Sequence, residues 1–464
     1  MSSIYAYGDF LDRLPLNRRH WLIFALCSLG FAFDALDFQI MALIAPAIAR
    51  EWKVEPQTMG FILSTTAIGM VLGSYLFGIV SDRIGRRTGF QLTVLIFSVF
   101  CGLSVFARNP TELAILRFFT GIGIGGFVPI DTAIMSEFMP KSSRGKLMAL
   151  WAISFSGGGL IAAFMARVVG ADLGWRSLFL VGAVPGILVL FVRMVIPESP
   201  RFLLQKGQEK EARRSIEWLA LGKPLPPAVG SAGLTSDLGI TKVTIRTLFS
   251  SAYRRRTTML WLLWFSWSFS YFGVLLWLPS LLVQHRGVPG AQVFTYMMGF
   301  LVIGMCGRAA IATVVDVWGR KNSIAVVGVL SSITLLVFSQ QAGYENLLLF
   351  GYLFAFFHDA GLSAIAPYTP ELYPTRARAT GVGYANGAGR IASIGSPIIV
   401  GFLVPVGLNA VFVVLAAGYL VAAIVVLSFG LETKGLVLED AALESGIGRT
   451  ATRMSGGNTR NSKK

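Results

Sequence analysis

The chain has 464 residues, of which 54% are hydrophobic and only 14% are charged, and its mean hydropathy is +0.65. Because ordinary soluble domains contain about 25% charged residues, this composition excludes an ordinary soluble enzyme. The formal net charge of +16 would point to nucleic acid in a soluble protein. In a chain this apolar we attribute the charge to membrane topology and expect no nucleic-acid partner.

Apolar stretches long enough to cross a lipid bilayer, which takes about 20 residues, recur along the whole chain. In chain order they lie at 21–49, 59–80, 89–107, 112–136, 146–169, 175–196, 257–283, 292–315, 323–340, 346–370, 380–404 and 409–429. Lipid cannot hydrogen-bond exposed backbone groups, so each stretch is predicted to be a helix. The sequence therefore predicts an all-α membrane protein with twelve transmembrane helices.

The basic residues outside these spans fall mainly in alternate loops. They include Arg18, Arg19, Arg83, Arg86, Arg87, Lys141, Arg144, Lys146, Arg320, Lys321, Arg376 and Arg378, with Arg460, Lys463 and Lys464 in the tail. The intervening loops are short and poorer in basic residues. Basic loops stay on the cytoplasmic side of a membrane, so we expect a multi-pass protein of a bacterial-type inner membrane with both termini in the cytoplasm.

Two motifs occur twice at one constant offset. "SDRIGRR" (81–87) resembles "VDVWGRK" (315–321), and "EFMPKSSR" (137–144) resembles "ELYPTRAR" (371–378). Matching positions are 234 residues apart in both pairs, and Glu198 and Glu432 share that offset. A single offset without net insertion indicates a duplicated unit of six helices.

The repeat predicts how the chain is divided. We expect a cytoplasmic N-terminus at 1–20, six-helix halves at 21–196 and 257–430, a cytoplasmic linker at 197–256, and a largely disordered cytoplasmic tail at 431–464. An even number of spans in each half makes the halves parallel, related by an axis along the membrane normal. Parallel halves around a central site are an architecture of secondary transporters.

The repeated motifs resemble those of a known family. "GIVSDRIGRR" resembles the signature loop between the second and third helices of the major facilitator superfamily, and "RFFTGIGIGG", "PESPRFL" and "LETKG" resemble motifs of its sugar porters and organic ion transporters. "PELYPTRARATGVG" (370–383) looks most like the organic ion and synaptic-vesicle-protein branch. Within bacteria that branch resembles nicotinate transporters and aromatic-acid/proton symporters, which carry D-G-x-D in the first helix where this chain has Asp34-Ala35-Leu36-Asp37.

The resemblance implies a cytoplasmic gate, in which charge-assisted bonds between helix ends hold one conformation closed. The predicted gate residues are Asp82, Arg86, Arg87, Glu137, Arg144, Asp316, Arg320, Lys321, Glu371 and Arg378. The alternative is that these residues serve only as topology signals and helix caps.

Asp34 and Asp37 lie three residues apart in an apolar helix, and therefore on one face. Ionised carboxylates in such a setting cost several kcal/mol unless they are paired or protonated. The estimated depth of Asp37 matches that of Arg117, and proton-coupled sugar porters, which the chain resembles, pair such residues. Separating the pair in a low dielectric favours the protonated acid, which predicts a proton switch; the alternative is a permanent structural ion pair.

Other ionisable residues inside the spans are functional candidates by default. Asp131 is expected near the inner edge of the fourth helix. His358 and Asp359 are neighbours about 100° apart on a helix and need not touch, and His358 could titrate near neutral pH or simply pack. The predicted proton-coupling set is Asp34, Asp37, Arg117, Asp131, His358 and Asp359.

Arg390 lies at mid-depth among small residues, where its planar fork suits a carboxylate. The alternative is that it pairs with Asp34 or Asp359. Aromatic side chains nearby could stack on a flat ring, although most aromatics in membrane proteins pack or face lipid. The predicted substrate-binding set is Arg390, Tyr384, Asn386, Tyr271, Trp267, Trp264, Phe33, Phe38 and Asp34.

These observations predict a monomeric proton symporter that imports a small, aromatic monocarboxylate such as nicotinate or a benzoate by alternating access. No nucleotide-binding motif is visible, so a proton gradient, and no cofactor or metal, is expected to drive transport. One alternative is a porter for an organic cation, sugar or polyol. Another is a non-transporting membrane receptor or sensor. No nucleophile–base pair emerges, so an enzyme is not expected.

Overall fold

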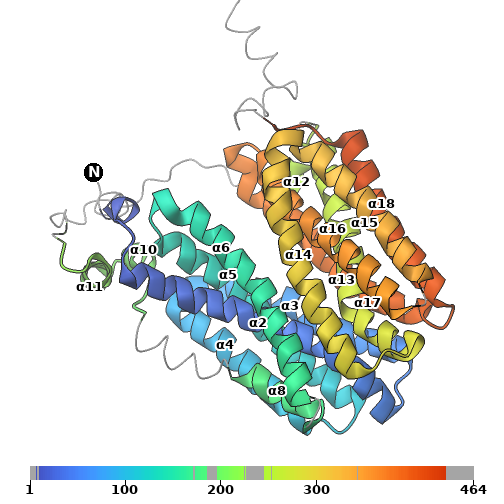
Figure 1. Ribbon diagram of the computed structural model, residues 1–464. Coiled ribbons are helices and arrows are strands. Elements are labelled where there is room, and N and C mark those ends of the chain that lie inside the picture. The colour runs from blue at the N-terminus through green and yellow to red at the C-terminus, as the bar shows by residue number, and fades with distance from the viewer. Residues whose placement is uncertain are drawn as a thin grey trace, which may run out of the picture. The chain divides into compact units, whose positions relative to one another are not determined.

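The computed structural model describes residues 7, 10–170, 173–184, 196–223, 225, 245–251, 253–341 and 343–434 (Figure 1). These residues form helices joined by short connections, and the described part of the chain contains no strand. Ten of its helices are long and apolar enough to cross a membrane. They are α2 (Arg18–Trp52), α3 (Pro56–Ile84), α4 (Arg86–Leu103, continued by the 3₁₀ helix Ser104–Phe106), α5 (Pro110–Phe138), α6 (Lys141–Met165, continued by the π-helix Ala166–Gly170), α13 (Arg254–Arg286), α14 (Gly290–Trp318), α15 (Arg320–Gln340), α16 (Tyr344–Glu371) and α18 (Leu408–Phe429).

Two of the twelve predicted spans need a separate description. The sixth, 175–196, begins as α8 (Arg176–Ala183), and most of its remainder lies outside the described residues. The eleventh corresponds to α17 (Thr375–Leu403), a continuous helix of 29 residues. Its stretch around Arg390 is rich in Gly, Ser and Asn, and α17 is not among the ten helices above. The all-helical membrane fold is thus confirmed.

The chain divides into two compact units. One comprises Met1–Asp237, Leu275–Leu301 and Pro397–Pro405, and the other comprises Leu238–Val274, Val302–Ser396 and Val406–Lys464. The predicted domain boundaries at 196 and 257 stay a prediction.

In the first unit, α3 packs along α5, and α2 along α6 (Figure 1). The glycines of "GIGIGG" allow the close approach of α3 and α5, because a Cβ at Gly121 would collide with the backbone carbonyl of Thr66 and one at Gly125 with that of Met70. Small residues at such contacts let helix backbones pack tightly. The glycine run is therefore a helix-packing element.

In the second unit, α15 packs against both α16 and α18. Serines of α13 and α17 hold neighbouring helices through their backbones. Ser270 Oγ of α13 donates to the carbonyl of Leu415 at 2.6 Å, and Ser396 Oγ of α17 donates to the carbonyl of Phe269 at 2.5 Å. These bonds fix the rotation of α13, and hence the direction of its aromatic side chains.

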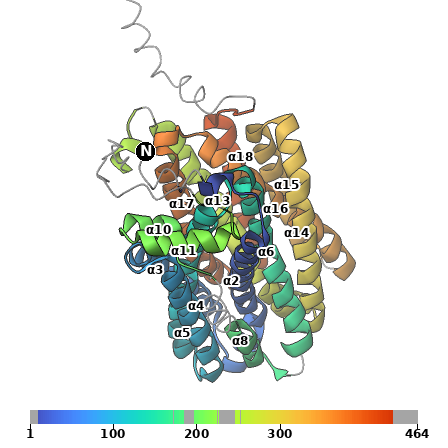
Figure 2. The ribbon, with the colours of Figure 1, turned by 90° about the vertical axis from the view of Figure 1, so that its left-hand side faces the viewer.

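The predicted linker contains three short helices, α10 (Pro200–Gln205), α11 (Glu209–Ala220) and α12 (Ile245–Leu248). Helix α11 is amphipathic and buries Ile216 and Leu219 one turn apart. Asn17 Nδ2 donates to the carbonyl of Leu219 at 2.9 Å, and Arg19 lies over the Trp218 ring at 4.8 Å. The linker helix is thereby anchored to the start of α2, with α10 beside it (Figure 2).

Candidate functional site

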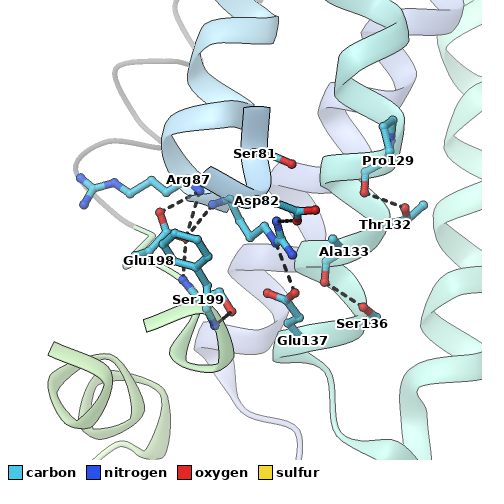
Figure 3. Close-up of polar contacts among 12 residues, drawn as sticks. Ser81, Asp82, Arg87, Pro129, Thr132, Ala133, Ser136, Glu137, Glu198 and Ser199 are labelled. Carbon is cyan, nitrogen blue, oxygen red and sulfur yellow. Dashed lines mark hydrogen bonds and ion pairs between the residues drawn. The ribbon is translucent and has the colours of Figure 1, made fainter. Parts of the chain in front are cut away.

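The first cluster of functional candidates lies where α3 ends and α4 begins. Arg86 contacts Asp82 Oδ1 at 2.5 Å and Glu137 Oε1, at the end of α5, at 3.3 Å. Gly85 separates the two helices with φ of 103°, a conformation that suits glycine. The sharp turn brings the end of α3 and the start of α4 against the same end of α5, as Figure 3 shows for Asp82 and Glu137.

A second carboxylate, Glu198, caps the start of α4. Its Oε1 accepts hydrogen bonds from the backbone N–H groups of Arg86 at 2.8 Å and Arg87 at 3.2 Å (Figure 3). A helix N-terminus presents unpaired N–H groups and a partial positive charge, so an acidic cap is favourable there. The segment after the sixth predicted span is thus tied to the turn between α3 and α4.

The same arrangement recurs 234 residues later. Arg320 contacts Asp316 at 2.9 Å and Glu371 at 3.4 Å, and its backbone N–H donates to Glu432 Oε1 at 2.9 Å. Gly319 has φ of 87° and takes the place of Gly85. Two equivalent networks in one chain support the duplication that the motifs indicated. We call them the first and second helix-end clusters: Asp82, Arg86, Glu137 and Glu198, and Asp316, Arg320, Glu371 and Glu432.

Four predicted gate residues are not side-chain members of these clusters. Arg87 and Lys321 contribute backbone N–H groups to Glu198 and Glu432. Arg144 pairs with Asp12 at 2.7 Å, and Arg378 Nε donates to the carbonyl of Tyr373 at 3.4 Å. Sequence reasoning noted the repeat of Glu198 and Glu432 but missed their capping role, and it missed Asp12, which carries no motif.

Inside the spans of the first unit, Asp37 and Arg117 form a buried ion pair. Arg117 Nη1 lies 3.0 Å from Asp37 Oδ1, and both side chains have no exposed surface. Cys101 Sγ donates to the same oxygen at 3.1 Å, and the Phe179 ring lies 5.1 Å from the guanidinium carbon. The predicted contact between the first and fourth membrane helices, α2 and α5, is confirmed.

The geometry of this pair is one-sided. A single hydrogen bond joins the two groups, and Arg117 Nε, Arg117 Nη2 and Asp37 Oδ2 have no hydrogen-bond partner among the described residues. Arginine and carboxylate often form two parallel bonds, which adds strength and fixes geometry. Separating a pair joined by one hydrogen bond breaks fewer interactions than separating a pair joined by two, although here both groups are fully desolvated.

Asp131 of α5 lies in a different environment. Trp151 Nε1 on α6 donates to Asp131 Oδ2 at 2.6 Å, and the thiol of Cys27 on α2 lies next to the carboxyl group. The Trp151 ring stacks on Phe31 with centroids 3.9 Å apart. Asp34, also on α2, is 4% exposed and close enough to influence Asp131 electrostatically.

In the second unit, Asp359 pairs with Arg308. Two nitrogens of Arg308, Nη2 and Nε, contact Asp359 Oδ1 at 2.6 and 3.1 Å, and the Tyr271 hydroxyl donates to the same oxygen at 3.3 Å. Arg308 was not among the predicted site residues. Asp359 therefore has an arginine from α14 as its partner, and Tyr271, predicted to contact substrate, also donates to this pair.

His358 contacts Tyr419 and Tyr271, and its angular separation from Asp359 on α16 allows this. Its Nδ1 contacts the Tyr419 hydroxyl at 2.5 Å, and its ring stacks on Tyr271 with centroids 4.2 Å apart. Trp267 is fully buried and packs edge-on against Tyr419 at 5.0 Å. His358, Tyr271 and Trp267 thus form one packed aromatic layer.

The predicted substrate residues of α17 are more open. Tyr384 is 41% exposed and stacks on Trp261, Asn386 is exposed, and Arg390 is half-buried. Trp264 of α13 is half-buried, and its Nε1 donates to Thr369 Oγ1 at 2.9 Å. Of the predicted aromatics in this unit, Trp264 and Tyr384 keep accessible ring surface.

The remaining predicted substrate residues belong to α2 in the first unit. Phe33 is half-buried, whereas Phe38 and Asp34 are buried.

Within the described residues, no group of three His, Cys, Asp or Glu side chains could hold a metal ion.

Long apolar helices that enclose buried arginine–aspartate pairs, with duplicated charged clusters at their ends, define a multi-pass membrane transporter. The chain belongs to the family described as "Sugar (and other) transporter", part of the major facilitator superfamily; the family model matches residues 38–444. It is accordingly a transporter and not an enzyme.

Individual relatives agree with this assignment. The chain is 33% identical to the niacin transporter NiaP of Acinetobacter baylyi over 93% of this chain and 99% of the relative. It is 30% identical to a gallate transporter of Pseudomonas putida, over 91% and 94%. The structure of the xylose transporter XylE from E. coli, in a partially occluded inward-open conformation, matches 91% of this chain and all of XylE, with a TM-score of 0.72 and 18% identity, which shows the shared fold.

Proposed function

We propose that this protein is a monomeric, proton-coupled importer of a small aromatic monocarboxylate such as nicotinate or a benzoate. The observation that carries the proposal is the similarity, along nearly the whole chain, to the niacin transporter and the gallate transporter. Niacin and gallate are both aromatic rings that bear one carboxyl group. The distribution of basic loops supports an inner-membrane location with both termini in the cytoplasm.

Arg390 is the residue proposed to bind the carboxylate. Its guanidinium can present two parallel N–H donors to the two oxygens of a carboxylate. Asn386, one turn earlier on α17, adds an exposed amide, and Trp264 and Tyr384 offer accessible ring surface. Tyr271 and Trp267 are assigned to packing, because both are buried in the aromatic layer around His358.

The Asp37–Arg117 pair is the proposed coupling switch. Desolvation makes each separated charge costly, so the pair holds α2 and α5 together while Asp37 is ionised. Protonation of Asp37 removes its charge and weakens the single bond to Arg117. The two helices could then move relative to each other. Protonation and deprotonation of Asp37 would thereby link proton entry to the transport cycle.

The two helix-end clusters are proposed to act as the cytoplasmic gate. Each cluster joins three chain segments through one arginine and three carboxylates. Such charge-assisted bonds stabilise one conformation and break when the helix ends separate. Asp12 contacts both Arg144 and Arg201. It thereby connects the N-terminal segment to α6 and α10 in the same unit as the first cluster.

Counterflow in proteoliposomes tests the proposed function. Vesicles that hold the purified protein and unlabelled nicotinate, gallate or benzoate should take up the same labelled acid, and an inward proton gradient should drive its accumulation. Nicotinamide, xylose and tetraethylammonium are the matched neutral and cationic probes. Exchange of xylose or tetraethylammonium but not of any acid would overturn the proposal in favour of a sugar or cation porter. Binding of an acid without exchange would instead indicate a sensor.

A further inference from the structure

Asp131 is a buried carboxyl group in a membrane span. Unlike Asp37 and Asp359, it has no arginine partner among the described residues. Its side chain has no exposed surface. Asp37 has Arg117 and Asp359 has Arg308, whereas Asp131 forms no ion pair with any described residue. Its Oδ2 accepts the bond from Trp151, and its Oδ1 has no hydrogen-bond partner in the described part of the chain.

The ionisable groups that face Asp131 come from α2. They are the thiol of Cys27 and the carboxyl group of Asp34. From α6 it meets the neutral indole of Trp151. On α5 itself, Glu137 lies six residues further on, about 9 Å along the helix axis, and it is engaged by Arg86. No positive charge among these neighbours offsets an ionised Asp131, and a negative Asp34 would oppose its ionisation.

An unpaired carboxylate in a dry environment is far more costly than the neutral acid. We therefore propose that Asp131 holds a proton in this conformation and is a second proton-binding site of the transporter, separate from Asp37. The role of Asp131 in transport rests on the proposed proton-driven function. The protonation of Asp131 does not depend on that function. Asp37 differs from Asp131 in that it has an arginine, Arg117, as its partner.

Release of this proton is tied to the contact between α2 and α6. Breaking the O–H bond leaves a carboxylate and passes the proton to water, and the carboxylate must then be hydrated. Water can reach it only if the helices around it separate, because Trp151 stacks on Phe31 and Gly158 of α6 packs directly on the backbone of Ala32. Opening of this contact is therefore expected to accompany loss of the proton.

Infrared spectroscopy of the purified protein tests the charge state without any substrate. A buried protonated carboxyl group gives a carbonyl stretching band that a carboxylate lacks. We expect this band at neutral pH in the wild type, its loss in Asp131→Asn, and its retention in Asp37→Asn and in the surface variant Glu217→Gln. Trp151→Phe should keep the ring stack but shift the band's frequency, because the indole donor is gone. A band that persists unchanged in Asp131→Asn overturns the proposal.

Transport then tests the role of the site. The amide oxygen in Asp131→Asn can still accept the Trp151 bond, so folding should be preserved, and a melting curve checks this. We expect counterflow of labelled nicotinate, or of whichever probe acid the wild type exchanges, to stay measurable, while the number of protons entering per molecule falls below the wild-type value. An unchanged proton count overturns a coupling role. If the wild type exchanges none of the acids, the proposed function fails, and the infrared result still decides whether Asp131 holds a proton.

Discussion

Arg308 donates two hydrogen bonds to one oxygen of Asp359, at 2.6 and 3.1 Å, and the hydroxyl of Tyr271 reaches that same oxygen. The arginine side chain keeps 20% of its surface exposed, while Asp359 keeps 5%. The pair joins α14 to α16, and Tyr271 extends it to α13. Asp359 therefore anchors three helices of the second unit through a single oxygen atom.

This arrangement predicts a strong and mutual dependence of the two residues. Asp359→Asn leaves Arg308 without its counter-charge, and loss of one partner of a buried pair costs about 3–5 kcal/mol. Thermal unfolding of the purified protein should show a clearly lower midpoint for Asp359→Asn and for Arg308→Gln. The double variant should lose less than the sum of the two single losses. Additive losses would show that the two side chains do not stabilise each other.

The helix-end clusters predict equal roles for Glu198 and Glu432. Each carboxylate accepts N–H groups at the start of the helix that follows a Gly with positive φ, and an acidic group at a helix N-terminus contributes about 0.3–2 kcal/mol. Glu198→Ala and Glu432→Ala should lower the midpoint of thermal unfolding by similar amounts. Asp82→Asn is the matched control, because the Asp82 side chain is 67% exposed and a surface pair contributes about 1 kcal/mol or less. A large loss in only one of the two cap variants would contradict an equivalent role.

The Asp37–Arg117 pair predicts a separation of coupling from exchange. Asp37→Asn removes the group that would change its protonation, so accumulation driven by a proton gradient should be lost. Counterflow needs no net proton movement and should stay measurable. Arg117→Ala should impair accumulation as well, because it leaves Asp37 buried without a counter-charge. Normal accumulation of substrate by Asp37→Asn against its gradient would exclude Asp37 as a coupling site.

The sequence predicts the helices from hydropathy, and it predicts the Asp37–Arg117 contact from matching depth together with the resemblance to proton-coupled sugar porters, which pair such residues. Hydropathy sets where a helix lies in the membrane, and a rise of about 1.5 Å per residue then places Asp37 and Arg117 at one depth. The constant offset of 234 residues likewise identifies the members of both helix-end clusters. It does not reveal that Glu198 and Glu432 are caps, because capping depends on how the chain folds back onto the start of the next helix.

The pairing of Arg308 with Asp359 could not be predicted in the same way. Membrane helices are apolar on most of their surface, so the sequence contains little information about their rotation. Depth alone allowed Asp359 to meet Arg390, and it left Tyr271 and Trp267 free to face a substrate. The packing of α13 by Ser270 turns both aromatics into the layer around His358. Asp12, which pairs with Arg144, lies before the first span in a segment without any recognisable motif.

Arg390 is the residue proposed to make the transporter select a negatively charged substrate. If its planar fork binds both oxygens of a carboxylate, Arg390→Lys should weaken binding although the positive charge remains. Loss of one charge-assisted bond costs about 1.5–3 kcal/mol, which corresponds to about a 10- to 150-fold loss of affinity.

Direct binding measurements with an acid and its amide test this assignment. Wild-type protein should bind nicotinate much more tightly than nicotinamide, since the amide has no charge for Arg390 to meet. In Arg390→Lys the difference between the two ligands should shrink, and binding of the acid should fall while that of the amide changes little. Equal affinities for acid and amide, unaltered by the substitution, would make Arg390 a structural residue and favour a neutral or cationic substrate, because no other predicted substrate-binding side chain carries a positive charge.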